Sequence, residues 1–132
     1  MFRDSVIPVD EAGLLDLVDV PTAGVEVVPG LCLLPTPGHT PGHIAVELTS
    51  REATALITGD CIHHPVQLAH PALGSCVDID PERAETSRRE LLSSLTDTDT
   101  LVLGTHFAPP TAGRVVTDRS AYRLTPVPAD SH

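Results

Sequence analysis

Apolar and polar residues change their spacing several times along the chain, and each spacing predicts a type of element. Residues 31–35 (LCLLP) form a short apolar run closed by proline, and residues 43–50 (HIAVELTS) alternate as a half-buried strand does. Residues 55–60 (ALITGD) are apolar until Gly59-Asp60, which is typical of a strand buried on both faces. The centre of the chain is therefore predicted to form a β-sheet.

The clearest helix is predicted just after residue 80. Asp80 is a typical N-cap, and Pro81 suits the first helical position. Apolar positions then recur at helical spacing until the polar run TDTDT ends the pattern. The predicted buried stripe consists of Ala84, Arg88, Leu91, Leu92 and Leu95. We expect this helix to pack on the sheet along that stripe.

The rest of the chain divides into a folded central part and two ends with weaker sequence patterns. Residues 100–107 (TLVLGTHF) predict a further buried strand, and residues 114–124 predict a C-terminal hairpin. Strands that alternate with one main helix favour an α/β (α+β) fold with a mixed sheet, spanning residues 30–125. Residues 1–29 are expected to be an irregular or helical lead-in, and residues 126–132 a flexible tail.

Two segments have no clean period. Residues 11–20 (EAGLLDLVDV) could form a short helix or a helix that runs into a strand. Residues 61–80 contain two prolines and three histidines, which is typical of an ordered loop over a cleft. We therefore expect this loop to carry functional residues.

Charge and composition narrow the classes of partner. The 132 residues suffice for one domain, and the formal net charge of −10 at pH 7 opposes binding to nucleic acid. All eight basic residues are scattered arginines, so no basic patch for a membrane surface is predicted. Three cysteines without CxxC spacing, and an N-terminus without a signal-peptide pattern, indicate a cytoplasmic protein. A small-molecule substrate is the expected partner.

Three polar residues follow the ends of predicted strands. His39 comes after LCLLP, Asp60 after ALITG and His106 after LVLGT, and a glycine precedes each of them. Taken singly, each is typical of a turn or a helix cap. Strands that run in the same direction would bring all three to one edge of the sheet, where α/β proteins place their sites. Histidine and aspartate are also ligands that zinc and similar divalent metals prefer.

These segments resemble a known family. PTPGHTPGHIAVEL, LITGDCIHHP and LVLGTHFAPPTAGRV are similar, in order and spacing, to the C-terminal half of metallo-β-lactamase-fold hydrolases, above all the lactonase and methyl parathion hydrolase branch. The resemblance implies half of an αββα sandwich and a dinuclear zinc site. It also implies that His39 binds one metal, that Asp60 bridges two metals and that His106 binds the second. Asp60 is thus both a metal ligand and a catalytic residue by resemblance.

The neighbouring histidines and cysteine receive weaker assignments. His43 is expected to fix the turn by hydrogen bonding rather than to bind metal. His63 is the candidate to face substrate or to stabilise the leaving group, with an ordinary loop histidine as the alternative. Cys61 is expected to be a small buried side chain, and His70 receives no role.

The expected ligand set is incomplete. The HxHxDH motif, which supplies further metal ligands in the family, has no counterpart in this chain. A zinc site needs about four ligands, whereas the trio would be spread over two metals. Three interpretations stay open: a hydrolase represented by its C-terminal half, a non-catalytic remnant that self-associates or needs a partner to cover its exposed sheet, and an unrelated small binding module.

Overall fold

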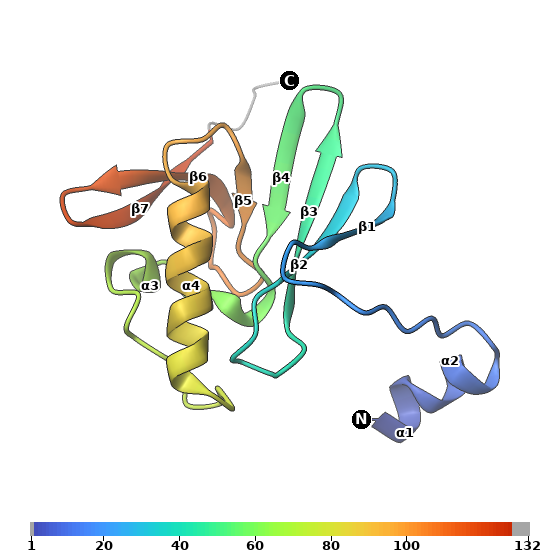
Figure 1. The fold of residues 1–132 in the computed structure, drawn as a ribbon. Coiled ribbons are helices and arrows are strands. Elements are labelled where there is room, and N and C mark those ends of the chain that lie inside the picture. Colours follow the sequence, from blue (N-terminus) through green and yellow to red (C-terminus); the bar gives the residue numbers. More distant parts are fainter. Residues whose placement is uncertain (1, 128–132) are drawn as a thin grey trace.

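A computed structural model describes residues 2–127 and contains one seven-stranded mixed sheet (Figure 1). The strands lie side by side in chain order. They are β1 (Val25–Val28), β2 (Leu31–Pro35), β3 (Ile44–Ser50), β4 (Ala53–Ile57), β5 (Leu101–Leu103), β6 (Ala112–Asp118) and β7 (Ala121–Pro126). The predicted mixed sheet and C-terminal hairpin, which is β6–β7, are confirmed.

Strand direction decides which strand ends meet. Strands β4 and β5 are parallel, and all other neighbours are antiparallel. As a result β2, β4 and β5 point the same way. A parallel pair needs a long crossover connection. Here it contains the 3-10 helix η1 (Gly59–Cys61), α3 (Val66–Ala69) and α4 (Pro81–Leu95).

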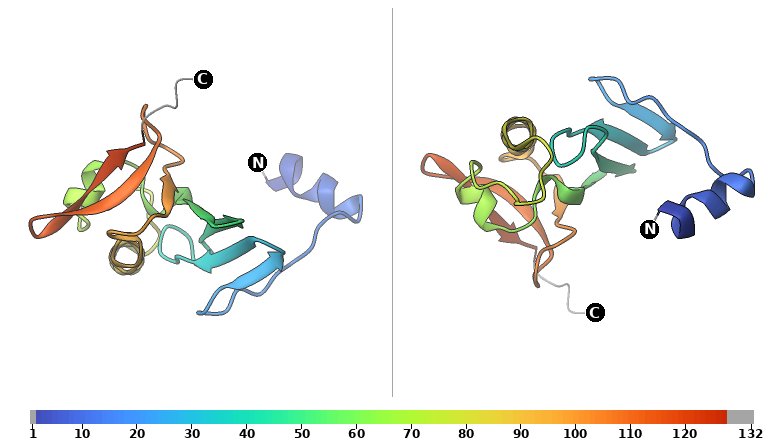
Figure 2. Two further views of the ribbon diagram at one scale, coloured as in Figure 1. Left: turned by 90° about the horizontal axis from the view of Figure 1, so that it is seen from above. Right: turned by 90° about the horizontal axis from the view of Figure 1, so that it is seen from below.

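Helix α4 covers one face of the sheet (Figures 1 and 2). Asp80 caps it as predicted, because its Oδ1 accepts a hydrogen bond from the backbone N–H of Arg83 at 3.0 Å. The helix buries Ala84, Ser87, Arg88, Leu91, Leu92 and Leu95, which confirms the predicted stripe. The three leucines join a core with Leu56, Val102 and Val115 from the facing strands.

The opposite face of strands β2 to β5 is apolar as well. Strand register places two rows across it: Leu33, Val46, Ile57 and Leu103, and then Leu31, Leu48, Ala55 and Leu101. None of these eight side chains is buried, and Leu48 is 38% exposed. The prediction that residues 55–60 are buried on both faces therefore holds for the face under α4 only.

The N-terminal lead-in differs in detail from the prediction. Helices α1 (Phe2–Ser5) and α2 (Ile7–Glu11) precede Gly13, whose φ of 67° suits the residue after a helix end, and they lie apart from the sheet (Figure 1). Residues 14–20, where helix was an option, have no regular structure, whereas β1 joins the sheet beside β2. Among the described residues, no helix is long and apolar enough to cross a bilayer. Residues 128–132 of the predicted tail lie outside the described residues.

The turn after β2 is bound to the start of α4. Gly38 accepts a hydrogen bond from the backbone N–H of Asp80 at 2.9 Å, and the Ser87 hydroxyl donates to the carbonyl of Pro37 at 2.6 Å. Gly38 has φ 136°, and a Cβ there would overlap the backbone of Ala84. This close approach positions His39, the next residue.

Gly38→Ala should therefore destabilise the fold. Left-handed strain and overlap with Ala84 together predict a loss of about 2 kcal/mol or more in the free energy of unfolding. Gly42→Ala, in the same turn, is the matched control, because its Cβ would meet nothing within 4 Å. Its effect should stay within about 0.5 kcal/mol. Urea denaturation followed by circular dichroism measures both, and equal stability of the two variants would contradict the assigned packing.

Candidate metal centre

The common direction of β2, β4 and β5 brings three predicted site residues to one edge of the sheet. His39 follows β2, Asp60 lies in η1 directly after β4, and His106 follows β5. The antiparallel strand β3 begins at this same edge, so His43 lies there too. Crossover residue His63 completes the group. The structure thus brings together every residue that the sequence predicted for the site.

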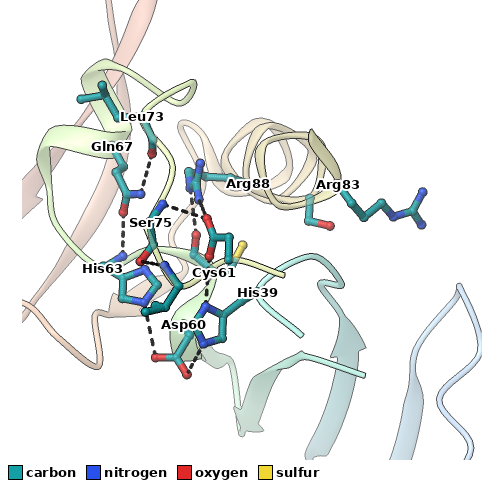
Figure 3. Close-up of polar contacts among 12 residues, drawn as sticks. His39, Asp60, Cys61, His63, Gln67, Leu73, Ser75, Arg83 and Arg88 are labelled. Atoms are coloured by element: carbon teal, nitrogen blue, oxygen red, sulfur yellow. Dashed lines mark hydrogen bonds and ion pairs between the residues drawn. The ribbon is translucent and has the colours of Figure 1, made fainter. Parts of the chain in front are cut away.

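Asp60 is the centre of this cluster (Figure 3). Its Oδ2 lies 3.6 Å from His39 Nε2, and its Oδ1 lies 3.8 Å from His63 Nε2. Oδ1 also has a short hydrogen bond with His106 Nε2. The His63 and His106 rings stack at 5.1 Å, and the His39 and His63 ring centroids lie 5.3 Å apart. One donor atom each from His39, Asp60 and His63 lies within 4.8 Å of the others.

Burial and neighbouring charges shift the pKa values of Asp60 and His63 toward the forms that bind metal. The side chains of His39 and His63 are 17% and 25% exposed, whereas Asp60 and His106 open to solvent at 38% and 47%. The His106 hydrogen bond lowers the pKa of Asp60, although partial burial opposes it. Burial lowers the pKa of His63, and attraction to Asp60 works against this shift. Near neutral pH the cluster therefore combines a carboxylate with a neutral His63 ring, the forms that bind metal.

His43 has both ring nitrogens occupied by the protein. Its Nδ1 lies 2.8 Å from the hydroxyl of Thr36 and 3.1 Å from the carbonyl of Thr36, and its Nε2 accepts the backbone N–H of Asp60 at 2.8 Å. A Cβ on Gly59 would lie 2.7 Å from that Nε2, so glycine is needed for this approach. His43 thus connects the turn after β2 to the backbone of Asp60.

A buried ion pair lies behind His39. The Asp78 side chain is fully buried; its Oδ1 is 3.0 Å from His39 Nδ1, and its Oδ2 accepts the backbone N–H of Ser75 at 2.8 Å. The guanidinium of Arg88, also fully buried, lies 3.8 Å from Asp78 Oδ2. Arg88 also donates to the carbonyls of Cys61 and Pro71 at 2.9 and 2.7 Å. Two carbonyls and one carboxylate thus surround this guanidinium.

Sequence reasoning missed Asp78, which lies in the loop of residues 61–80. The available signal was Arg88, a charged residue within an apolar helical stripe, because a buried charge needs a partner. Cys61 is a small buried side chain as expected. Burial raises the pKa of its thiol to about 12, so the metal-free thiol stays protonated at neutral pH.

A mixed sheet that gathers histidines and a carboxylate at the ends of co-directed strands gives an α/β protein residues that could hold a metal ion. The family model of the metallo-beta-lactamase superfamily matches residues 8–106, and the chain belongs to this superfamily. The resemblance seen in the three motifs is thereby confirmed. Comparison with curated proteins finds no match.

Solved structures show the same fold. The dizinc quorum-quenching lactonase AidC is 20% identical, with a TM-score of 0.79 over 97% of this chain and 47% of its own. The hydrolase AbOPH of the beta lactamase superfamily is 22% identical, with a TM-score of 0.82 over 98% of this chain and 44% of its own. An N-acyl homoserine lactone hydrolase, with N-hexanoyl-L-homoserine at its catalytic metal center, is 25% identical with a TM-score of 0.58, over 72% and 36%.

The chain spans less than half the length of these structures. Its own donor set nevertheless fits a divalent metal: imidazole nitrogens and a carboxylate suit zinc, and several of them point at a common centre around Asp60. The superfamily and the similar structures together support a metal-dependent hydrolase fold.

Proposed function

We propose that this chain supplies the C-terminal part of a zinc-dependent hydrolase site that opens a lactone or cleaves an ester or phosphotriester. The observation that carries the proposal is the convergence of His39, Asp60 and His106 at one sheet edge. The lactone is favoured because two similar structures are described as lactone-hydrolysing enzymes. Two zinc ions would need further ligands beyond these three residues, such as water.

The chain's own residues would each have a defined part. Asp60 offers Oδ2 to the side of His39 and Oδ1 to the side of His106, an arrangement suited to a bridging carboxylate. His43 holds the backbone of Asp60, and Asp78 holds the ring of His39, so both ligands are oriented before metal binds. When bound, zinc supplies Lewis acidity and a water-derived nucleophile at neutral pH. His63, which lies beside Asp60, would face the substrate or stabilise its leaving group.

Hydrolysis assays test this proposal. Tag-free protein equilibrated with zinc would be assayed against N-hexanoyl-homoserine lactone, an aryl acetate and an aryl phosphotriester. We expect zinc-dependent turnover, fastest on the lactone and abolished in Asp60→Asn. Rates no higher than those of free zinc on all three substrates would refute hydrolysis by this chain.

The uncovered apolar face favours a second candidate function. In this candidate the chain is a half-domain without a hydrolytic site of its own, and it functions only when another polypeptide covers its sheet. The two rows that include Val46, Ile57 and Leu103 resemble one face of a sandwich core, and solvent-exposed apolar patches of this kind mark association surfaces. For the isolated chain, we propose that a second copy covers this face.

Leu48→Glu should weaken that self-association. A charge placed in the middle of the face must be desolvated when two copies meet, so the dissociation constant should rise by roughly tenfold or more. Val66→Glu is the matched control, because Val66 is similarly exposed but lies on α3. Sedimentation velocity over a concentration series measures both. A wild-type chain that stays monomeric at every concentration would contradict this candidate.

A reducing compartment is also proposed. Cys32, Cys61 and Cys76 are all free thiols, and none of them contributes a disulfide to the fold. The cytoplasm would keep them reduced, because disulfides are rare there.

A further inference from the structure

We propose that a cleft outside the metal centre binds a small organic anion, in which a carboxylate or phosphate group is attached to an apolar body. This hairpin cleft lies between the loop after α3, helix α4 and the turn of the β6–β7 hairpin (Figure 1). The polar side chains in its lining are His70, Arg89, Asp118, Arg119, Ser120 and Tyr122. Because no side chain of the metal centre lines it, the proposal depends neither on metal binding nor on hydrolysis.

The hairpin cleft has the size and the fixed walls of a ligand site. Its volume is about 820 Å³, and pockets for small molecules usually measure about 300 to 1,000 Å³. Nη1 of the buried Arg88 donates to the carbonyl of Pro71 at 2.7 Å, which fixes the loop after α3 to helix α4. Helix α3 contacts β7, and Tyr122 of β7 packs against the hydrophobic core. The walls therefore form without a ligand, which lowers the cost of binding one.

Two guanidinium groups from distant parts of the chain carry the preference for an anion. Arg89 lies on α4, and Arg119 lies in the two-residue turn between β6 and β7. Arginine binds carboxylate and phosphate groups through paired, charge-assisted hydrogen bonds. Arg89 has a salt bridge with Glu85 at 2.7 Å, whereas the Arg119 side chain has no hydrogen-bond or ion-pair partner among residues 2–127. Arg119 is thus the guanidinium that is free to pair with a ligand.

The rest of the lining suits the other parts of such a ligand. The imidazole of His70 and the hydroxyl of Tyr122 also have no partner in the described part of the chain, and both are available to donate to an anion. Asp118 in the lining and Glu85 beside Arg89 offset part of the positive charge, so we expect one anionic group rather than a polyanion. The apolar body would contact the small apolar side chains of the lining, which are Ala69, Pro71, Ala72 and Ala121.

Titrations of the isotope-labelled, metal-free chain, followed by two-dimensional NMR of the backbone amides, test the proposal. Benzoate and phenyl phosphate are the anionic probes, and benzamide is the uncharged analogue of benzoate. We expect saturable shifts around His70 and Tyr122 with at least one anion. Benzamide should bind roughly tenfold or more weakly than the better anion, because it cannot form charge-assisted hydrogen bonds as an acceptor anion does. Comparison of the two anions shows which group the hairpin cleft prefers.

Arg119→Gln should weaken binding of the better anion by roughly tenfold, because it removes the unpaired guanidinium. Arg51→Gln is the matched control. Arg51 has φ 57° and Arg119 has φ 58°, and each begins the two-residue turn of a hairpin, so the two substitutions meet the same backbone conformation. Arg51 does not line the hairpin cleft, and its variant should bind the anion as the wild type does.

The outcomes decide the proposal without reference to catalysis. Saturable shifts at the hairpin cleft, with selective loss of affinity in Arg119→Gln, support it whether or not the chain hydrolyses any substrate. No saturable shifts with either anion, or shifts centred on His39 and His63 instead, would overturn it. Equal affinities of Arg119→Gln and Arg51→Gln, or benzamide binding as tight as that of the better anion, would overturn it as well. Both variants replace exposed side chains, and their amide spectra verify that they fold.

Discussion

Replacing Asp60 by asparagine should reduce zinc affinity by roughly 100-fold or more, beyond the cost of losing an outer-shell partner. Asp60 is the carboxylate that the rings of His39, His63 and His106 all approach, and a neutral amide is a much weaker metal ligand. The fold should persist, because the backbone N–H of Asp60 still donates to His43 and the side chain is partly exposed.

Thermal unfolding with and without zinc measures the Asp60→Asn effect. A ligand at about 100 times its dissociation constant stabilises a protein by about 2.7 kcal/mol, so zinc should raise the melting temperature of the wild type and not of the variant. Asp99→Asn is the control, because Asp99 is a fully exposed carboxylate beside Arg114, away from the cluster. Equal zinc-induced shifts in all three proteins would show that Asp60 is no ligand.

Replacing Asp78 by asparagine should weaken zinc binding by about 10- to 100-fold, although Asp78 itself binds no metal. The carboxylate accepts from Ser75 and from Nδ1–H of His39, and in the neutral ring this leaves Nε2 of His39 free for metal. An asparagine that keeps the Ser75 bond presents its N–H to His39 Nδ1. The His39 proton then moves to Nε2 and blocks the ligand atom.

Nitrogen NMR of the histidine rings in metal-free protein reads this tautomer directly, with His39→Gln to assign the signals. The wild type should carry its His39 proton on Nδ1, and Asp78→Asn should carry it on Nε2. Loss of the carboxylate also leaves buried Arg88 without its charged partner, so urea denaturation should show a loss of about 3 kcal/mol. An unchanged tautomer in a folded variant would exclude the positioning role of Asp78.

Much of the sheet edge could be predicted because its signals are local. Apolar runs that end in glycine and then His39, Asp60 or His106 identify strand ends, whatever the rest of the fold does. Their convergence required only that the three strands share a direction. The structure meets that condition with β3 placed between β2 and β4, and this inserted strand is what brings His43 to the backbone of Asp60.

The lead-in could not be predicted to the same degree. Residues 11–20 have helical composition, yet the helices lie earlier and a strand follows at Val25–Val28. Short helices without a packed face are marginal, so a local pattern does not fix where they form. Strand β1 forms because it pairs with β2, which begins at Leu31, and the apolar pattern of β1 alone does not show this pairing.

By itself, the sequence determined the mixed sheet, the capped helix α4 and three of the clustered side chains, because periodicity and turn residues act over a few neighbouring positions. Only the tertiary structure decided that His63 joins His39 around Asp60 and that Asp78 and Arg88 lie behind His39. Each of these depends on contacts between residues far apart in the chain. Such contacts follow from strand order and loop path, which no local pattern encodes.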